Sequence, residues 1–140
     1  MNASGWAYGE GMQLQLRDDL PYVRVSITHS GKSIEIPNVL VDTGSGGTIL
    51  AADVMSAVGV IPEAEDTLHT IFGVGGSEVV FTRRIEMLSV GTYTIRHFEV
   101  EVGGMDYGFD IQGILGMDFL ITAGALINLK DLKIEFFELS

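Results

Sequence analysis

Asp42 is the residue whose neighbours in the sequence best suit it to do chemistry. It directly follows the apolar run Val39–Val41 and precedes the small residues Thr43–Gly47. A carboxylate at the end of a buried strand loses hydration, which costs free energy unless hydrogen bonds or a charged role compensate. The small residues leave room for backbone N–H groups and a substrate to approach it. The pattern suits a general acid or base, although by itself it is more typical of a strand that turns through Asp and Gly.

Two glycine-containing segments further along the chain add to this pattern. Residues 71–76 read Ile-Phe-Gly-Val-Gly-Gly, which is typical of a flexible hairpin tip of the kind that closes over active sites. Ile114–Gly116 is an apolar pair followed by glycine, and it precedes a short helix expected over Asp118–Ala123, which opens with an acid and ends at a glycine. Alone, the first segment is a hairpin and the second belongs to the core.

The elements that must position these residues are mostly β-strands. Polar and apolar residues alternate from Met12 to Leu16 and from Val23 to Ile27, which is the period of half-buried strands. A helix is expected over Ala51–Val58, where glycine and proline follow. Further strands are expected over Ile34–Ile36, Glu78–Phe81, Ile85–Val90, Thr94–Val102, Ala125–Leu129 and Lys133–Leu139. About eight short strands and two helices predict a mostly-β barrel or sandwich.

Length and composition limit the domain organisation and the function. The chain has 140 residues, 19 acidic against 8 basic, and a net charge of −11, which opposes nucleic-acid binding. Without cysteine it has no disulfide or thiol nucleophile. We expect no metal, no cofactor and no membrane span, and a cytoplasmic location. Residues 1–11 are expected to be a flexible N-terminal arm, residues 12–140 a single domain, and the acidic run Glu63–Asp66 a solvated loop.

In this order, the three segments resemble motifs of the retroviral-type (retropepsin-like) aspartic proteases. The similarity runs from Tyr22 to Phe137, with the active-site motif as Leu40–Ser45, the flap as Ile71–Gly76 and the second motif as Ile114–Gly116. The chain looks like a bacterial-like single-domain member of this family. The resemblance implies a single-lobe, closed acid-protease barrel of short strands that is active as a two-fold homodimer.

The resemblance also implies a role for individual residues. Asp42 of each copy would face its twin, Thr43 would reach the backbone of the other subunit, Gly44 would line the floor of the site, and Ser45 would support it. The flap and substrate-binding positions would be Ile71, Phe72, Gly73, Val74, Gly75, Gly76, Gln112 and Ile114.

The implied function is that of an aspartic endopeptidase. One carboxyl group cannot be acid and base at once, and two within hydrogen-bond distance share a proton, as is well known for aspartic proteases. The paired Asp42 carboxylates would activate a water that hydrolyses a peptide bond of a polypeptide substrate. The strands expected over Met12–Leu16 and Ile134–Leu139 are predicted to build the dimer interface.

Two alternatives stay open. The first is a non-catalytic dimeric module that binds a peptide or protein on the same fold, since a fold does not determine a function. The second is a monomeric β-barrel in which Asp42 is only a turn residue.

The chain departs from the retroviral members around the motif. Those enzymes pair an acid after the triplet with an arginine after the second motif, and this chain has Gly46 and Met117 at these positions. Losing both halves of an ion pair is tolerable, whereas losing one leaves a stranded charge. Ser45 replaces a common alanine, and its hydroxyl is expected to hydrogen-bond the ionised Asp42.

Overall fold

The computed structural model describes residues 6–8, 11–73, 76–107 and 110–139. The strands in these ranges are β1 (Trp6–Tyr8), β2 (Met12–Gln13), β3 (Gln15–Arg17), β4 (Leu20–His29), β5 (Lys32–Val41), β6 (Ile49–Ala51), β7 (Leu68–Gly73), β8 (Gly76–Val90), β9 (Tyr93–Gly103), β10 (Gly113–Leu115), β11 (Ala125–Asn128) and β12 (Lys133–Leu139). The helices are α1 (Ala52–Met55), a 3-10 turn η1 (Ser56–Val58) and α2 (Met117–Thr122). The expectation of a mostly-β protein with two short helices is confirmed.

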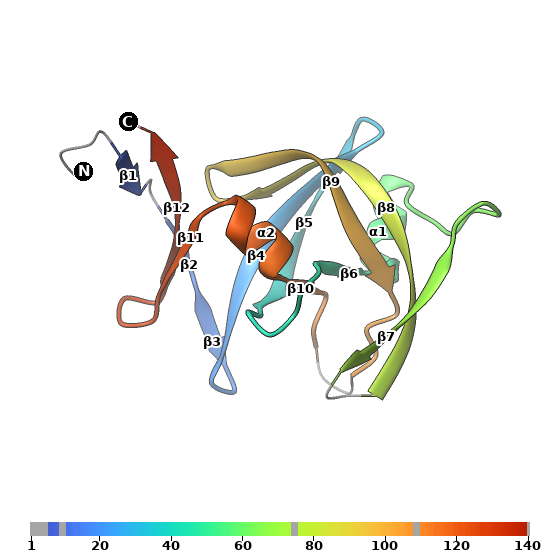
Figure 1. Cartoon of the computed structure of the whole chain (residues 1–140), viewed down its shortest axis with the longest axis horizontal. Helices are drawn as coiled ribbons and strands as arrows, with labels where there is room; N and C mark the ends of the chain where they lie inside the picture. The colour runs from blue at the N-terminus through green and yellow to red at the C-terminus, as the bar shows by residue number, and fades with distance from the viewer. Residues whose placement is uncertain (1–5, 9–10, 74–75, 108–109, 140) are drawn as a thin grey trace.

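The strands form two sheets, shown in Figure 1. The larger has the order β3-β4-β5-β10-β6-β9-β8-β7, and β4 also pairs with β8. The pairings therefore run from β4 through β5, β10, β6, β9 and β8 back to β4. The smaller sheet has the order β1-β12-β11, with β2 also paired to β12. Helix α2 lies between the two sheets in Figure 1.

Strand β10 inserts between β5 and β6, and this insertion positions the candidate site. It runs parallel to β5, where Gly113 is opposite Val39, and antiparallel to β6, where Gly113 is opposite Leu50. A Cβ at Gly113 would lie 3.0 Å from Leu50 Cδ2 and 3.2 Å from Val39 Cγ2. Glycine thus lets the third strand fit into the gap, because any side chain would press on both neighbours.

The main core is built from the large sheet, both helices and strand β12 of the small sheet. Phe119 of α2 is fully buried and meets Phe136 of β12 edge to face, with ring centroids 6.1 Å apart. Such aromatic pairs add stability beyond the area that they bury. A second group, the small apolar cluster, contains Tyr22, Ile49, Ala51, Met105 and Ile111, with Leu40, Val54, Ile71, Tyr107 and Ile114 packed against it.

Two differences from the expected elements bear on the hairpin and on the small sheet. The strands expected over Glu78–Phe81 and Ile85–Val90 are one strand, β8, because the residues between them pair with β9, Thr82 opposite Glu101 among them. Within the segment expected to be an arm, Trp6–Tyr8 forms β1, because the edge of β12 offers unpaired backbone groups.

In the described part of the chain, no helix has the length and apolar character needed to cross a membrane.

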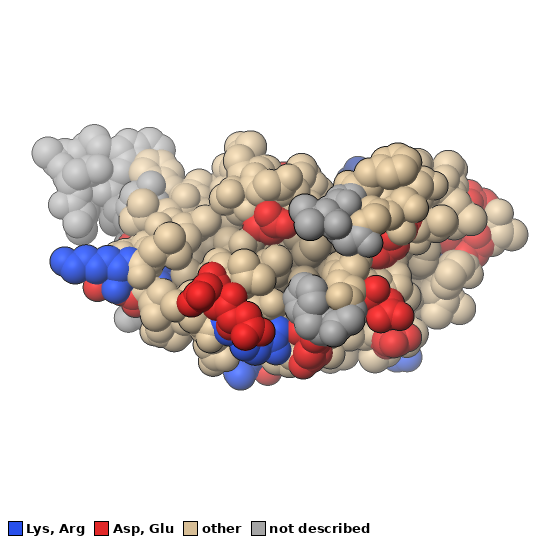
Figure 2. Space-filling view, turned by 90° about the horizontal axis from the view of Figure 1, so that it is seen from below, with Lys and Arg blue, Asp and Glu red and all other residues tan. Residues whose placement is uncertain are grey.

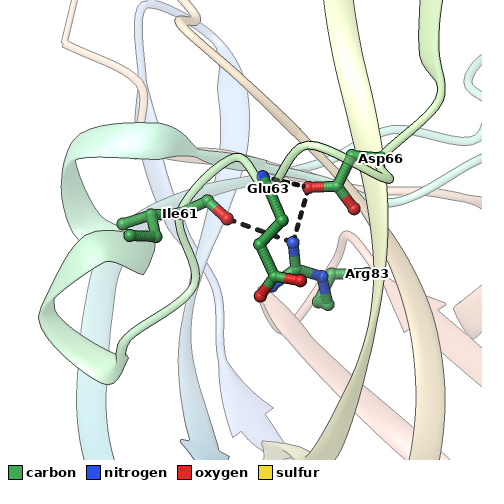
Figure 3. A network of polar contacts seen from close by, with 4 residues as sticks. All are labelled: Ile61, Glu63, Asp66 and Arg83. Carbon is green, nitrogen blue, oxygen red and sulfur yellow. Dashed lines mark hydrogen bonds and ion pairs between the residues drawn. The ribbon is translucent and has the colours of Figure 1, made fainter.

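The acidic run before β7 is mostly exposed, as expected of a solvated loop, and it is also bound to β8 by Arg83 (Figure 3). The Arg83 guanidinium donates to Asp66 Oδ2 at 2.7 Å and to the Ile61 carbonyl at 3.1 Å. Both of these bonds come from Nη2 of Arg83, and its Nη1 lies 3.4 Å from Glu63 Oε1. The side chains of Arg83 and Asp66 are only 16% and 11% exposed. This network attaches the loop that precedes β7 to Arg83 of β8, the strand that pairs with β7.

Candidate active site

Asp42 follows β5 directly and is held by its neighbours in space. Its backbone N–H donates to the carbonyl of Leu115 in β10 at 3.1 Å, which continues the pairing of the two strands by one residue. Its Oδ1 accepts the N–H of Gly44 at 2.9 Å. Within the described residues Oδ2 accepts no hydrogen bond from the protein, and the side chain is half-buried. One oxygen is thus anchored while the other stays available.

The residues that follow Asp42 form the active-site loop, residues 42–48, which is attached to the start of α2. The N–H of Met117 donates to the Ser45 carbonyl at 2.8 Å, and the N–H of Asp118 donates to the Gly46 carbonyl at 3.1 Å. A Cβ at Gly116 would lie 2.3 Å from the Gly47 carbonyl oxygen. Close approach of the two backbones therefore requires glycine in the Ile114–Gly116 motif.

A buried polar link between Thr48 and Asp118 reinforces this attachment. Thr48 is fully buried. Its hydroxyl donates to Asp118 Oδ1 at 2.7 Å, its N–H donates to Oδ2 at 3.1 Å, and the hydroxyl oxygen accepts the N–H of Gly116 at 3.1 Å. Gly46 and Met117 stand where the retroviral enzymes have an ion pair. The Thr48–Asp118 link joins the same two segments without those charges. Neither Thr48 nor Asp118 is among the site residues expected from the sequence, although an acid at the start of α2 is a visible signal.

The expectation for the Ser45 hydroxyl is wrong. It donates to the carbonyl of Gly47 at 2.8 Å, not to Asp42. The reason is local, because a serine in a tight turn readily bonds a backbone group two residues away. Gly44 supplies the donor to Asp42 through its backbone instead.

Thr43 is exposed and borders a hollow of about 390 Å³ beside the active-site loop. The other lining residues are Met117, Leu120, Ile121, Gly124, Ala125, Ile127 and Phe137. They come from α2 and from the small sheet, so the hollow joins the active-site loop to the strands near the C-terminus. Its lining is mostly apolar, and Ile121 is 70% exposed.

The other expected site residues, in the β7–β8 hairpin and in β10, differ in how far they are exposed. Ile71 and Ile114 are half-buried and belong to the same small apolar cluster, so the fold brings them together. Phe72 is 83% exposed. Gly73 pairs with Gly76, whose φ of +112° suits glycine. Val74 and Gly75, at the expected tip, lie outside the described residues.

Gln112 lies immediately before β10. Its carbonyl accepts the N–H of Ala51 at 2.9 Å, and its N–H donates to Asn38 at 2.9 Å. Its side-chain Oε1 is buried and has no hydrogen-bond partner within the described residues. In those residues, no three His, Asp or Glu side chains group closely enough to hold a metal ion.

Comparison with known proteins decides the family. The family model described as aspartyl protease matches residues 23–119, which include Asp42, the hairpin and the Ile114–Gly116 motif. The chain belongs to the aspartyl protease family. The crystal structure of a retropepsin-like aspartic protease from Rickettsia conorii is similar to it, with a TM-score of 0.68 and 22% identity over 94% of each chain. The two share a fold, and the resemblance found in the sequence is confirmed. No curated protein matches the chain.

This member of the aspartyl protease family carries a further acid next to its active-site loop. The N–H of Glu101 in β9 donates to the Thr48 carbonyl at 2.9 Å, and a Cβ at Gly47 would lie 3.1 Å from Glu101 Oε1. Burial raises the pKa of Glu101, and the nearby charge of Asp118 raises it further, while His69 opposes the shift. The sequence analysis did not identify Glu101, because a single acid in an alternating strand reads as a surface residue.

The face that carries the hairpin and the active-site loop is acidic. Figure 2 views the molecule from below, and Asp and Glu side chains are spread over this face while Lys and Arg lie toward its edges. The distribution agrees with the net charge of −11. Anionic molecules would be repelled from this side of the aspartyl protease domain.

Proposed function

We propose that the chain is an aspartic endopeptidase that works as a homodimer, with Asp42 of the two copies as the catalytic pair. The observation that carries the proposal is the way Asp42 is held. Its backbone is bound by β10, its Oδ1 by Gly44, and its loop by the start of α2. The Asp-Thr-Gly triplet occurs once in the sequence, so a pair of carboxylates requires two chains.

The paired carboxylates would divide the work. Two carboxyl groups in hydrogen-bond contact cannot both ionise, so they hold one proton between them. The ionised group takes a proton from a bound water, whose oxygen attacks the peptide carbonyl carbon. The protonated group donates a hydrogen bond to the developing oxyanion. Collapse of the tetrahedral intermediate breaks the C–N bond and transfers a proton to the leaving amine. The strand pairings that run from β4 through β8 and back to β4 support a closed barrel as the frame of the site.

The hollow beside Thr43 is the surface that we assign to the second copy. It is mostly apolar, and Ile121 and Phe137 at its border are 70% and 38% exposed. Among the described strands, β1 and β11 form the edges of the adjoining small sheet. An apolar surface next to a sheet edge is suited to association. A two-fold axis here would bring the two active-site loops together, because Thr43 belongs to both the loop and the hollow.

The substrate would be an extended polypeptide bound under the β7–β8 hairpin, which would act as the flap. A peptide in this position adds main-chain hydrogen bonds as a strand, and its side chains fill pockets on alternate sides. Ile71, Phe72 and Ile114 are apolar and flank this space, which favours apolar residues on either side of the cleaved bond.

The proposal is tested with the wild type and the Asp42→Asn variant incubated with a peptide library at about pH 4 to 6, where carboxylates can share a proton. We expect cleavage by the wild type and a loss of roughly 1,000-fold or more in the variant. Asp53→Asn, in an exposed acid of α1, is the matched control and should leave cleavage unchanged. Equal cleavage by the wild type and the Asp42→Asn variant would overturn the proposal. Absence of cleavage by a dimeric wild type would point to the peptide-binding module instead.

Sedimentation of Ile121→Lys tests the dimer. A buried lysine at the apolar border would be strongly unfavourable, so we expect a monomer and an activity that falls steeply on dilution. Ile61→Lys, an exposed isoleucine in the loop after η1, is the control and should stay dimeric. A wild type that is strictly monomeric at high concentration would contradict the paired-carboxylate mechanism.

A further inference from the structure

The Glu78 carboxylate ties the hairpin to the segment that follows β9. Its Oε1 accepts the backbone N–H of Met105 at 3.2 Å, and its Oε2 accepts the Tyr107 hydroxyl at 3.0 Å. Glu78 lies on β8 directly opposite Ile71 of β7. Both oxygens of one side chain therefore connect the hairpin to a separate part of the chain. Hydrogen bonds to an ionised acceptor are stronger than neutral ones.

The chain is shaped to make room for this contact. A Cβ at Gly103 would lie 2.2 Å from Glu78 Oε1 and 2.8 Å from Val80 Cγ1, so any side chain there would displace the carboxylate. Met105 has a φ of +55°, in the left-handed region that a residue with a side chain rarely adopts. Such a conformation persists only where its surroundings compensate. Its N–H bond to Glu78 and its burial, with 4% exposure, supply that compensation.

The segment that Glu78 holds is also attached to the strands that carry the site. Met105 and Tyr107 pack in the small apolar cluster with Ile71 and Ile114. Further along, Asn38 of β5 donates to Asp110 Oδ2 at 2.8 Å. Because β5 leads directly to Asp42, the described residues after β9 contact the hairpin on one side and the strand before the catalytic residue on the other.

We propose that Glu78 is a positioning residue, which sets the height of the hairpin above the substrate groove by holding Met105 and Tyr107. This inference rests on the proposed function, in which the hairpin is the flap. It goes beyond that function by assigning control of substrate binding to a contact away from the catalytic carboxylates. The Tyr107 hydroxyl stays a donor over the working range, since burial and the bond to Glu78 raise its pKa to about 12.

The first test measures amide hydrogen exchange of the full chain without substrate, in the wild type, Glu78→Gln and Tyr107→Phe. The Gln amide has the size of the Glu side chain but no charge and only one acceptor oxygen, so the charge-assisted contact to Met105 and Tyr107 is weakened. We expect exchange about tenfold faster in β7, in the first half of β8 and in residues 103–107, with β5 and β10 unchanged. Glu65→Gln, an exposed acid in the loop before β7, is the charge-matched control and should exchange as the wild type does.

The second test separates binding from chemistry in peptide cleavage. A loosened hairpin should raise KM roughly five- to tenfold and change kcat by less than about twofold, because the active-site loop is untouched. Gly103→Ala should reproduce this split, since its methyl group displaces Glu78 while the charge is kept. The double variant Glu78→Gln with Tyr107→Phe should be no worse than Glu78→Gln alone, since the Tyr107 contact is one of those that Glu78 makes.

Three results would overturn the inference. They are exchange in Glu78→Gln that equals the wild type, exchange accelerated uniformly over all strands, and a fall in kcat at constant KM. Uniform acceleration would mean that Glu78 only stabilises the fold. If the wild type cleaves no peptide, the proposed function fails, while the exchange pattern still decides whether Glu78 positions the hairpin.

Discussion

Asp118 accepts two hydrogen bonds from Thr48, from the hydroxyl at 2.7 Å and from the backbone N–H at 3.1 Å. The Thr48 hydroxyl in turn accepts the N–H of Gly116. The end of the active-site loop and the start of α2 are therefore joined by a carboxylate, a hydroxyl and two amides. An ionised acceptor bound by several donors needs no cationic partner to be stable in a half-buried place.

Asp118→Ala is expected to lower the free energy of unfolding by about 2 to 3 kcal/mol, because the fully buried Thr48 loses its acceptor. Urea unfolding followed by circular dichroism measures the change. Asp53→Ala removes an acid from the first turn of α1, where no loop is attached, and should change stability by less than about 0.5 kcal/mol. Equal effects of the two substitutions would show that the Thr48 link contributes nothing.

Gly116→Ala is expected to destabilise the protein by about 2 to 4 kcal/mol, because its methyl group would lie 2.3 Å from the Gly47 carbonyl oxygen. Gly46→Ala is the control, since a Cβ at Gly46 meets no atom within 4 Å. It should change the unfolding free energy by less than about 0.5 kcal/mol. Thermal unfolding of the pair measures the difference. Similar melting temperatures would mean that the two backbones do not approach as closely as described.

Arg83→Met is expected to cost about 2 kcal/mol of unfolding free energy, because Asp66 is left nearly buried without its cation. Arg84→Met changes the neighbouring exposed arginine of β8 and should be nearly neutral. Proteolysis of the loop before β7 gives a second measurement, and we expect faster cutting only in the Arg83 variant. A loop cut equally fast in both variants would argue against the network in Figure 3.

Glu101→Gln is expected to make the protein more stable at neutral pH and to lose that advantage as the pH falls. Burial raises the pKa of Glu101 above its ordinary value. The folded state therefore holds the proton more tightly than the unfolded chain, and the wild type loses stability as the pH rises through the folded pKa. Gln mimics the protonated form and removes this loss. Unfolding curves at several pH values measure it, and a gain that grows toward low pH would have the wrong sign.

Features encoded over short stretches could be predicted from the sequence. The ends of α1 and η1 taken together and of α2 lie within one residue of the expected helix ends, because glycine, proline and an acid mark them locally. Asp42 follows a strand as expected, since an apolar run ending in Asp and Gly is a local signal. The strand expected to break near Arg83 continues, however, because its pairing with β9 outweighs the local preference of the residues between the two apolar runs.

The contacts that complete the site depend on residues distant in the sequence. Thr48 and Asp118 are far apart along the chain, and no periodicity links a buried hydroxyl to an acid at a helix start. The same holds for Glu78 and Tyr107. For Ser45 the error concerns the side-chain rotamer, which composition does not determine, and the hydroxyl donates to the carbonyl of Gly47.

The insertion of β10 between β5 and β6 also governs when the polypeptide becomes competent during its synthesis. The ribosome releases Asp42 long before Leu115, so the nascent chain has its acid but lacks the strand that anchors it. Pairing between such distant segments forms late in folding. Until β10 has been synthesised, the gap between β5 and β6 stays unfilled and the backbone of Asp42 lacks its bond to Leu115. The order of the strands thereby makes the anchoring of Asp42 depend on β10, a segment far downstream in the chain.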